Sequence, residues 1–289
     1  MSVPDYPLLL APDLHVRAWG GSRLGDGVGE AWDLSVHAHG PSTVRNGALS
    51  GTRLSDVVEA HPEAFGGPVR LLAKRLDCKE ALSVQVHPRT HDPKTEAWVV
   101  LEADPGAGVY HGFLGAPTRG EVRRAAEEGS LPSLLRFVAV ERGDVVLVPA
   151  GTVHAIGGGL FLFEIQQSAD TTYRLFDWGR GRELHLDHAL GAAALDPREP
   201  RPAARPLDGG ERLVATEHFT VDRVAGGEPV AIDPGGAWKA AFLAEGSAAV
   251  DGVPLGPGET VLVPGAAGVR TLEPAAACLL LLYGPVPPG

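Results

Sequence analysis

A stretch near the middle of the chain, Gly143-Asp-Val-Val-Leu-Val-Pro-Ala-Gly-Thr-Val-His-Ala-Ile156, decides the fold class. Four apolar residues, Val145 to Val148, stand between a turn glycine and a Pro-Ala-Gly segment. Short apolar runs bounded by glycine or proline are typical of buried strands. The stretch therefore predicts a turn, a strand, a tight turn and a second strand that begins at His154.

The same pattern returns near the end of the chain. Gly143-Asp-Val-Val-Leu-Val-Pro149 is matched by Gly258-Glu-Thr-Val-Leu-Val-Pro264, so each copy has a turn glycine, an acid, four strand residues and a proline. An internal repeat of this kind indicates two similar structural units. His154 follows its proline by five residues, and the equivalent position in the second copy is Val269. We therefore predict a mainly β chain with two β jelly rolls, of which only the first carries chemistry.

A proline-rich segment divides the chain. Residues 196–210 contain four prolines and end in Asp-Gly-Gly, a composition typical of a stiff connector. We expect a catalytic domain in residues 1–195, a linker in residues 196–210, and a second, metal-free jelly-roll domain in residues 211–289. A few short helices are expected in the first domain, within residues 52–65, 122–128 and 182–195.

The composition disfavours several classes of function. The 38 glycines and 25 prolines among 289 residues favour turns and short strands over long helices. A formal net charge of −11 disfavours nucleic-acid binding, which needs a dense basic face. The longest apolar run, residues 275–283, is much shorter than the roughly 20 residues of a membrane span. We therefore expect neither a nucleic-acid partner nor a membrane partner, and the sequence leaves the oligomeric state open.

The cysteine content and the N-terminal residues bear on the cellular location. Two cysteines, Cys78 and Cys278, can build neither a disulfide framework nor a cysteine-rich zinc site. The first ten residues lack a basic segment and are broken by Pro4 and Pro7, unlike a secretory signal. Both observations favour a cytoplasmic protein.

Polar residues that can bind a metal alternate with valines in Ser83 to Trp98. Successive side chains of a strand point to opposite faces, so Gln85 and His87 would share one face and the two valines the other. Glu96 follows after a polar loop, and His154 begins the strand described above. Two histidines, one carboxylate and one amide oxygen suit zinc, with room for water or substrate. The alternative is that each histidine is an ordinary hydrogen-bonded group of the core or surface.

Charged residues in neighbouring predicted strands and loops suggest an anionic substrate. Lys74, Lys94 and Arg174 are cations that would hold such a substrate, and an arginine suits forked binding of phosphate oxygens. Glu164 is a carboxylate on an apolar strand. A carboxylate beside cations and a metal makes a site for proton transfer. The alternative for each residue is an ordinary salt bridge. The sequence has neither a glycine-rich phosphate loop of known spacing nor Gly-x-Ser-x-Gly, which disfavours nucleotide chemistry and serine hydrolysis.

Several motifs, in order, resemble those of the type I mannose-6-phosphate isomerases, particularly the short bacterial form. The matching stretches, which span about residues 17–190, are Arg17-Ala-Trp-Gly-Gly, Gly29-Glu-Ala-Trp, Leu71-Leu-Ala-Lys, Leu82-Ser-Val-Gln-Val-His-Pro, Lys94-Thr-Glu, Gly143 to Ile156, Glu164-Ile-Gln-Gln-Ser-Ala-Asp-Thr-Thr-Tyr-Arg and Arg182-Glu-Leu-His. The resemblance implies two cupin-type β jelly rolls. It implies one zinc ion per chain, with the ligands Gln85, His87, Glu96 and His154. It also implies a sugar-phosphate pocket lined by Trp19, Glu30, Lys74, Lys94, Glu164 and Arg174.

The resemblance implies interconversion of mannose 6-phosphate and fructose 6-phosphate through a cis-enediol. Lys94 and Arg174 would assist catalysis, and Glu164 is the first choice for the base because it is an uncommitted carboxylate on a core strand. The loop from His87 to Lys94 is much shorter than in many family members. We therefore expect a pocket rim that is either more open or closed by another segment.

Two other functions are compatible with these motifs. The first is a different metal cupin enzyme, such as an oxygenase or another sugar-phosphate isomerase. The second is a non-catalytic, sugar-binding or regulatory cupin, which would bind its ligand without turnover. The presence of Lys94, Glu164 and Arg174 beside a full ligand set favours the isomerase.

Overall fold

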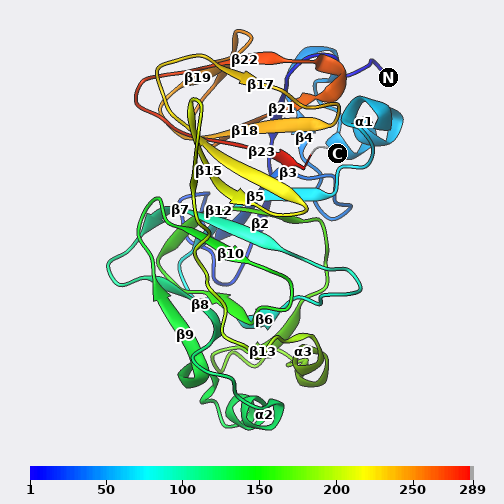
Figure 1. The fold of residues 1–289 in the computed structure, drawn as a ribbon. Helices are drawn as coiled ribbons and strands as arrows, with labels where there is room; N and C mark the ends of the chain where they lie inside the picture. The colour runs from blue at the N-terminus through cyan, green and yellow to red at the C-terminus, as the bar shows by residue number, and fades with distance from the viewer. Residues whose placement is uncertain (287–289) are drawn as a thin grey trace. The chain divides into compact units, whose positions relative to one another are not determined.

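The computed structural model describes residues 1–286 and is mainly β, as predicted (Figure 1). The chain forms two compact units. The first contains Met1–Leu14, Trp32–Lys74 and the chain from Ala203 onward, and the second contains His15–Ala31 and Arg75–Pro202. One passage between the units, after Pro202, falls inside the expected 196–210 connector. Neither unit is a single continuous stretch of the chain, because N-terminal segments belong to both. The functional division into a catalytic domain and a metal-free domain stays a prediction.

The first unit contains two complete antiparallel sheets. The eight-stranded sheet has the order β14-β15-β16-β23-β18-β21-β1-β4, and the four-stranded sheet has the order β17-β22-β19-β20. The strands are β1 (Leu8–Ala11), β4 (Thr43–Val44), β14 (Arg205–Leu207), β15 (Gly210–Ala215), β16 (Phe219–Val224), β17 (Val230–Ile232), β18 (Trp238–Glu245), β19 (Ala248–Val250), β20 (Val253–Leu255), β21 (Glu259–Pro264), β22 (Arg270–Pro274) and β23 (Leu279–Pro285).

One hydrophobic core joins the two sheets of the first unit. Leu243 and Leu280 come from the larger sheet, Val250 and Leu272 from the smaller, and all four are fully buried in the same cluster. Two sheets that bury their apolar faces against each other form a sandwich. The remaining elements of this unit are the helix α1 (Leu54–Ala60) and the 3-10 turns η1 (Gly47–Leu49), η2 (Pro62–Phe65) and η4 (Gly265–Ala267).

The second unit contains a five-stranded sheet and most of a six-stranded one. Their orders are β13-β6-β11-β8-β9 and β10-β7-β12-β5-β3-β2. The chain passes between the units within β2 (Asp13–Val16), β3 (Val28–Leu34) and β5 (Leu71–Cys78). The other strands are β6 (Val84–Val86), β7 (Glu96–Ala103), β8 (Gly108–Phe113), β9 (Leu135–Ala139), β10 (Val145–Val148), β11 (His154–Ile156), β12 (Leu160–Gln167) and β13 (Tyr173–Phe176).

The short helices follow local sequence signals, with two corrections of length. The helix expected in residues 52–65 ends at Ala60, because Pro62 cannot continue it and starts η2 instead. The helix expected in residues 122–128 is α2 (Arg119–Glu127), which begins with a capping box of Thr118 and Glu121, and η3 (Leu131–Leu134) follows it. None of the helices in residues 1–286 is long and apolar enough to cross a membrane.

The third helix, α3 (Leu186–Ala192), is shorter than the 182–195 that the sequence predicts. Arg182 binds Asp177 through its guanidinium, and the backbone N–H of His185 donates to the carbonyl of Arg174. These contacts hold residues 182–185 beside β13, so the helix begins only at Leu186. Local helix propensity is weak enough for such tertiary contacts to override it.

Both copies of the internal repeat form the same local structure. Gly143 and Gly258 have φ angles of 89° and 79°, which a turn glycine adopts at little cost, and each precedes an antiparallel strand, β10 or β21. After the strand the copies differ. His154 begins β11 and is buried, whereas Val269 is 61% exposed. The potential ligand is therefore confined to the copy in the second unit.

Candidate metal centre and active site

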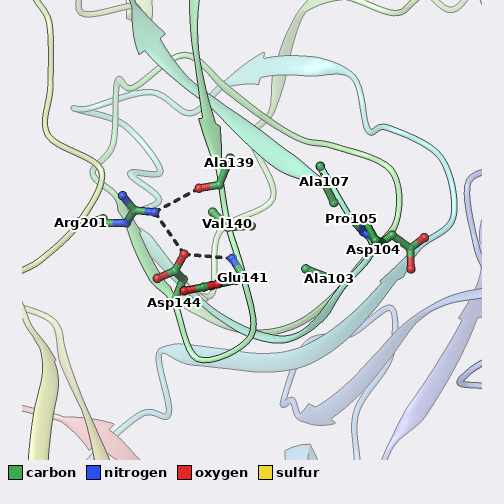
Figure 2. A pocket seen from close by; sticks show the side chains of 10 residues that line it. Ala103, Asp104, Pro105, Ala107, Ala139, Val140, Glu141, Asp144 and Arg201 are labelled. Carbon is green, nitrogen blue, oxygen red and sulfur yellow. Dashed lines mark hydrogen bonds and ion pairs between the residues drawn. The ribbon is translucent and has the colours of Figure 1, made fainter.

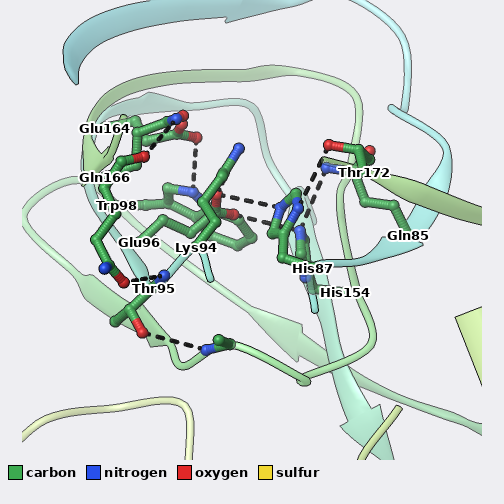
Figure 3. Close-up of polar contacts among 12 residues, drawn as sticks. Gln85, His87, Lys94, Thr95, Glu96, Trp98, His154, Glu164, Gln166 and Thr172 are labelled. Carbon is green, nitrogen blue, oxygen red and sulfur yellow. Dashed lines mark hydrogen bonds and ion pairs between the residues drawn. The ribbon is translucent and has the colours of Figure 1, made fainter. Parts of the chain in front are cut away.

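Pairing between short strands of the second unit brings the four predicted metal ligands together (Figure 3). β11 pairs antiparallel with β6, and His154 lies directly opposite Gln85. His87 follows β6 immediately, while Glu96 is the first residue of β7. The valines that alternate with Gln85, Val84 and Val86, are fully buried in a hydrophobic cluster. The valines thus bury one face of β6 in the core, and Gln85 lies on the opposite face, beside His154.

Glu96 stands between the two histidines. Its Oε2 lies 3.4 Å from Nε2 of His87, and its Oε1 lies 3.2 Å from Nε2 of His154. All three side chains are about 1% exposed. These spacings match the edge of about 3.4 Å that a tetrahedron of ligands has at zinc–nitrogen distances of about 2.1 Å. His87, Glu96 and His154 can therefore hold one metal ion.

Backbone carbonyl groups determine which nitrogen of each histidine faces the centre. Nδ1 of His87 lies 3.0 Å from the carbonyl oxygen of Thr171, and Nδ1 of His154 lies 2.9 Å from that of Thr152. A carbonyl only accepts, so both Nδ1 atoms carry the proton and both Nε2 atoms keep a lone pair. Nε2 of His87 is buried without a hydrogen-bond partner. An oriented lone pair without a donor is what a metal ligand requires.

The side-chain amide of Gln85 completes the set. It lies 3.3 Å from Nε2 of His154. The amide nitrogen and oxygen of glutamine exchange places by rotation about the last side-chain bond, and their assignment follows from their partners. With the oxygen turned inward, Gln85 would supply a neutral fourth ligand, and this role stays a prediction.

Electrostatics keep the ligands in their metal-binding protonation states. Burial lowers the pKa of His87, and it lowers the pKa of His154 to about 3. Burial alone would raise the pKa of Glu96, but Lys94, His154 and His87 together outweigh burial and hold the pKa of this carboxyl well below its usual range. Near neutral pH the site therefore presents two neutral imidazoles and one carboxylate, which need not release protons to bind a metal.

Two further predicted residues are buried beside the ligands. Nζ of Lys94 lies 3.1 Å from Oε2 of Glu96, so the loop that ends at Lys94 returns its cation to the centre. Glu164 lies opposite Trp98 in the β12–β7 pair and accepts a hydrogen bond of 2.9 Å from the indole nitrogen. The Trp98 ring also contacts the ring of His154 edge-on, with the centroids 5.6 Å apart. Figure 3 shows these side chains converging on one region.

Comparisons with known proteins point to one family. Residues 10–107 match the model of the catalytic domain of type I phosphomannose isomerase. A mannose-6-phosphate isomerase of Streptococcus mutans is 38% identical over 245 residues, which cover 74% of this chain and 77% of that protein. The chain belongs to the type I mannose-6-phosphate isomerase family. It is accordingly an enzyme with the cupin fold.

Other relatives of the family agree. A mannose-6-phosphate isomerase of Bacillus subtilis is 39% identical over 211 residues, which cover 64% of this chain and 67% of that protein. A solved structure of mannose 6-phosphate isomerase from the same organism, 29% identical, superposes with a TM-score of 0.87 and covers 96% of this chain and 99% of that one. A further solved isomerase, described as zinc-bound, is 14% identical with a TM-score of 0.81 and shares the fold, covering 97% of this chain and 100% of that one.

Arg174 lies next to the ligands by strand register. β13 pairs with β6, and Arg174 is directly opposite Gln85. One guanidinium nitrogen donates to the carbonyl of Glu183 at 2.7 Å, whereas Nε is buried without a hydrogen-bond partner. Burial and the positive charge of Arg182 lower the pKa of Arg174, so this edge of the site is rich in positive charge.

Three other residues that the family resemblance places in the pocket lie in different surroundings. Trp19 is 7% exposed and belongs to the hydrophobic cluster that contains Leu76 and Val100. Glu30 forms an ion pair of 3.0 Å with Arg17. Lys74 is buried on β5 in the first unit. Their roles in binding the sugar phosphate stay predictions.

Sequence reasoning missed the groups that hold the ligand-bearing segments in place. The Thr95 hydroxyl accepts the N–H of Ala150 at 3.2 Å, and Gln167 Oε1 accepts the N–H of Thr95 at 3.0 Å. The N–H of Gly151 donates to the carbonyl of His87 at 2.8 Å. Backbone groups and ordinary polar side chains have no distinctive spacing in a sequence, so no motif identified them.

A separate pocket lies beside two turns that connect the sheets of the second unit (Figure 2). It has a volume of about 600 Å³ and lies between the β7–β8 turn, the β9–β10 turn and Arg201. Arg201 donates to the carbonyl of Ala139 and to Asp144, both at 3.1 Å, and thereby ties the chain after α3 to the β9–β10 turn. None of the predicted site residues lines this pocket.

Proposed function

We propose that this enzyme is a zinc-dependent aldose–ketose isomerase that interconverts mannose 6-phosphate and fructose 6-phosphate through a cis-enediol. The observation that carries the proposal is the buried centre of His87, Glu96 and His154, with Lys94 on the same carboxylate. The names of relatives that are 38% and 39% identical supply the substrate.

Gln85, His87, Glu96 and His154 are the proposed zinc ligands. Their donor set of nitrogen and oxygen atoms, their burial and their spacing support this assignment, as does the zinc-bound solved relative. When bound, the metal would polarise the substrate carbonyl and stabilise negative charge on its oxygen.

Lys94 and Glu164 are the proposed acid–base groups. The reaction moves one proton between C2 and C1, so it needs a base that removes the proton from one carbon and returns it to the other. Glu164 is a buried carboxylate whose position is held by Trp98. Lys94 is a buried ammonium group that can donate a hydrogen bond to the oxygen on which negative charge develops.

Arg174 is the proposed anchor of the phosphate group. A guanidinium binds two phosphate oxygens at once, and Nε of Arg174 has no partner of its own. We extend the proposal to Trp19, Glu30 and Lys74 as further contacts of the sugar phosphate, on the strength of the family motifs alone. We also propose a cytoplasmic location, which the two cysteines far apart in sequence support.

A coupled assay of mannose 6-phosphate conversion tests the function directly. The chain should be active as purified, lose activity with a chelator and regain it when zinc is restored. His154→Ala should be inactive under all three conditions, because one ligand is gone. Absence of isomerase activity in zinc-loaded protein would contradict the proposal, and oxygen consumption with bound iron would instead indicate an oxygenase.

A further inference from the structure

The short loop between His87 and Lys94 is fastened at its tip by Asp92. One carboxylate oxygen, Oδ2, accepts three hydrogen bonds from the segment before β13: 3.1 Å from the N–H of Asp170, 2.9 Å from the N–H of Thr171 and 2.6 Å from the hydroxyl of Thr171. A second contact lies beside it, since Nε2 of His91 is 3.2 Å from the Tyr173 hydroxyl. The loop is thus fastened to the segment before β13, and the expected effect of its short length on the pocket rim stays a prediction.

Asp92 also has a special backbone conformation. Its φ angle is +52°, and within residues 1–286 only Trp178 and Asp251 share a positive φ among residues other than glycine. Aspartate tolerates this left-handed region better than most residues, but the conformation still costs free energy and persists only where the surroundings enforce it. The three hydrogen bonds to residues 170–171 supply that enforcement.

The segment that Asp92 holds is the one that orients His87. Thr171 donates its N–H and its hydroxyl to Asp92, and its carbonyl accepts the Nδ1–H of His87 at 3.0 Å. The hydroxyl of the next residue, Thr172, lies 3.3 Å from the same nitrogen (Figure 3). Asp92, Thr171 and His87 therefore form a continuous chain of contacts from the loop surface to the buried centre.

From this chain we infer that Asp92 is a positioning residue: through Thr171 it holds His87 in the tautomer that presents Nε2 to the metal. The inference rests on the proposed function only in that His87 is taken to be a metal ligand. Carboxylates and carbonyls behind a metal-binding histidine determine its tautomer and orientation, and their loss weakens metal binding about 10–100-fold.

Asp92→Ala should release residues 170–171 and leave the Thr171 carbonyl free to turn away. Competition with a chromogenic chelator measures the zinc dissociation constant of the full chain, and we expect it to rise about 10–100-fold. Asp92→Asn keeps one acceptor oxygen and the tolerance of positive φ, so its increase should be smaller than that of the alanine variant.

Asp251 provides a matched control in the first unit. It also has a positive φ, of 47°, and its carboxylate accepts the N–H of a threonine, Thr271, at 2.9 Å. Asp251→Ala removes the same type of loop contact from a site without proposed chemistry. It should lower the melting temperature while leaving the zinc dissociation constant within about twofold.

The ring nitrogen shifts of His87 in the metal-free full chain provide a test that does not depend on catalysis. Long-range ¹H–¹⁵N NMR spectra should show the Nδ1–H tautomer in the unmodified chain and in Asp251→Ala, and a mixture of tautomers in Asp92→Ala. An unchanged tautomer and an unchanged zinc dissociation constant in Asp92→Ala would overturn the inference. The two proposals can fail separately. If the zinc-loaded unmodified chain shows no isomerase turnover but Asp92→Ala still shifts the tautomer, the proposed function is overturned and the positioning role is retained.

Discussion

The carboxylate of Glu96 contacts both the proposed metal ligands and a cationic side chain. Its carboxylate lies between two neutral imidazoles that a metal would bridge, and it also forms an ion pair of 3.1 Å with Lys94. A carboxylate with nearly complete burial needs a positive partner, and Lys94 supplies it in the structure. A bound metal would take over this task, so that Lys94 becomes available for the substrate oxygen.

Lys94→Gln tests that division of roles. We expect kcat to fall about 10²–10³-fold, the usual cost of removing one donor from a developing oxyanion. Zinc should bind as tightly as before or more tightly, because one positive charge beside the ligands is gone. Activity and the zinc dissociation constant are the two measurements, and loss of zinc from Lys94→Gln would make the lysine a support of the metal centre instead.

Glu164→Gln tests the proposed base. The amide is nearly isosteric and can still accept the hydrogen bond from Trp98, so the fold and the zinc affinity should be preserved. Without a group to take the proton, kcat should fall about 10²–10⁴-fold. Binding of mannose 6-phosphate, measured by calorimetry, should change little. Full activity of this variant would exclude Glu164 as the base, and ligand binding without turnover in the unmodified chain would favour a non-catalytic cupin.

At the scale of elements, the connector between β13 and α3 depends on one buried carboxylate. Asp177 is 4% exposed and accepts hydrogen bonds from Nε of Arg182 at 2.9 Å and from Arg180 at 3.1 Å. These contacts keep residues 178–185 beside the strand that carries Arg174. They are also the reason that α3 begins later than its sequence predicts.

Asp177→Asn should change how stability depends on pH. Burial alone would raise the pKa of Asp177, but the hydrogen bonds and charges of Arg182 and Arg180 outweigh it and lower the pKa. The native state therefore favours the charged carboxylate, and this contribution is present above the unfolded pKa of about 3.9 and is lost as the pH falls through the lower native value.

Urea unfolding between pH 7 and pH 2.5 measures this effect. At pH 7 the unmodified chain should be more stable than Asp177→Asn, and the two urea midpoints should approach each other as the pH falls below about 4. A constant difference between the midpoints over the whole range would show that the carboxylate charge does not contribute.

At the scale of the whole molecule, the two compact units use one local motif for different purposes. In the second unit the strand β10 leads through a tight turn to His154, and in the first unit β21 leads through η4 to the exposed Val269. The metal centre draws all its proposed ligands from the second unit. Metal binding should therefore stabilise that unit directly.

Removal of zinc should lower the melting temperature. A ligand present at about 1,000 times its dissociation constant adds about 4 kcal/mol to stability. For a unit of this size, 1 kcal/mol corresponds to about 2–4 °C, so a chelator should lower the midpoint by roughly 10 °C. Differential scanning calorimetry of the unmodified chain and of His154→Ala provides the comparison. A chelator effect of equal size in His154→Ala would place the metal elsewhere.

The sequence by itself determined the β class and the repeat, and it predicted the four proposed ligands. Alternation of valine with polar residues around Gln85 and His87, and the turn residues around Val145 to Val148, are local signals that persist in the fold. The motifs also identified the family, which the comparisons confirmed.

Only the tertiary structure decided how distant segments meet. It assigned the N-terminal strand β1 to the sheet that contains β21, and it shortened α3 through contacts with Asp177 and β13. It also revealed that Asp92 fastens the loop and that the Thr171 carbonyl orients His87. Such contacts use backbone groups and common side chains, whose partners depend on the path of the whole chain and leave no pattern in the sequence.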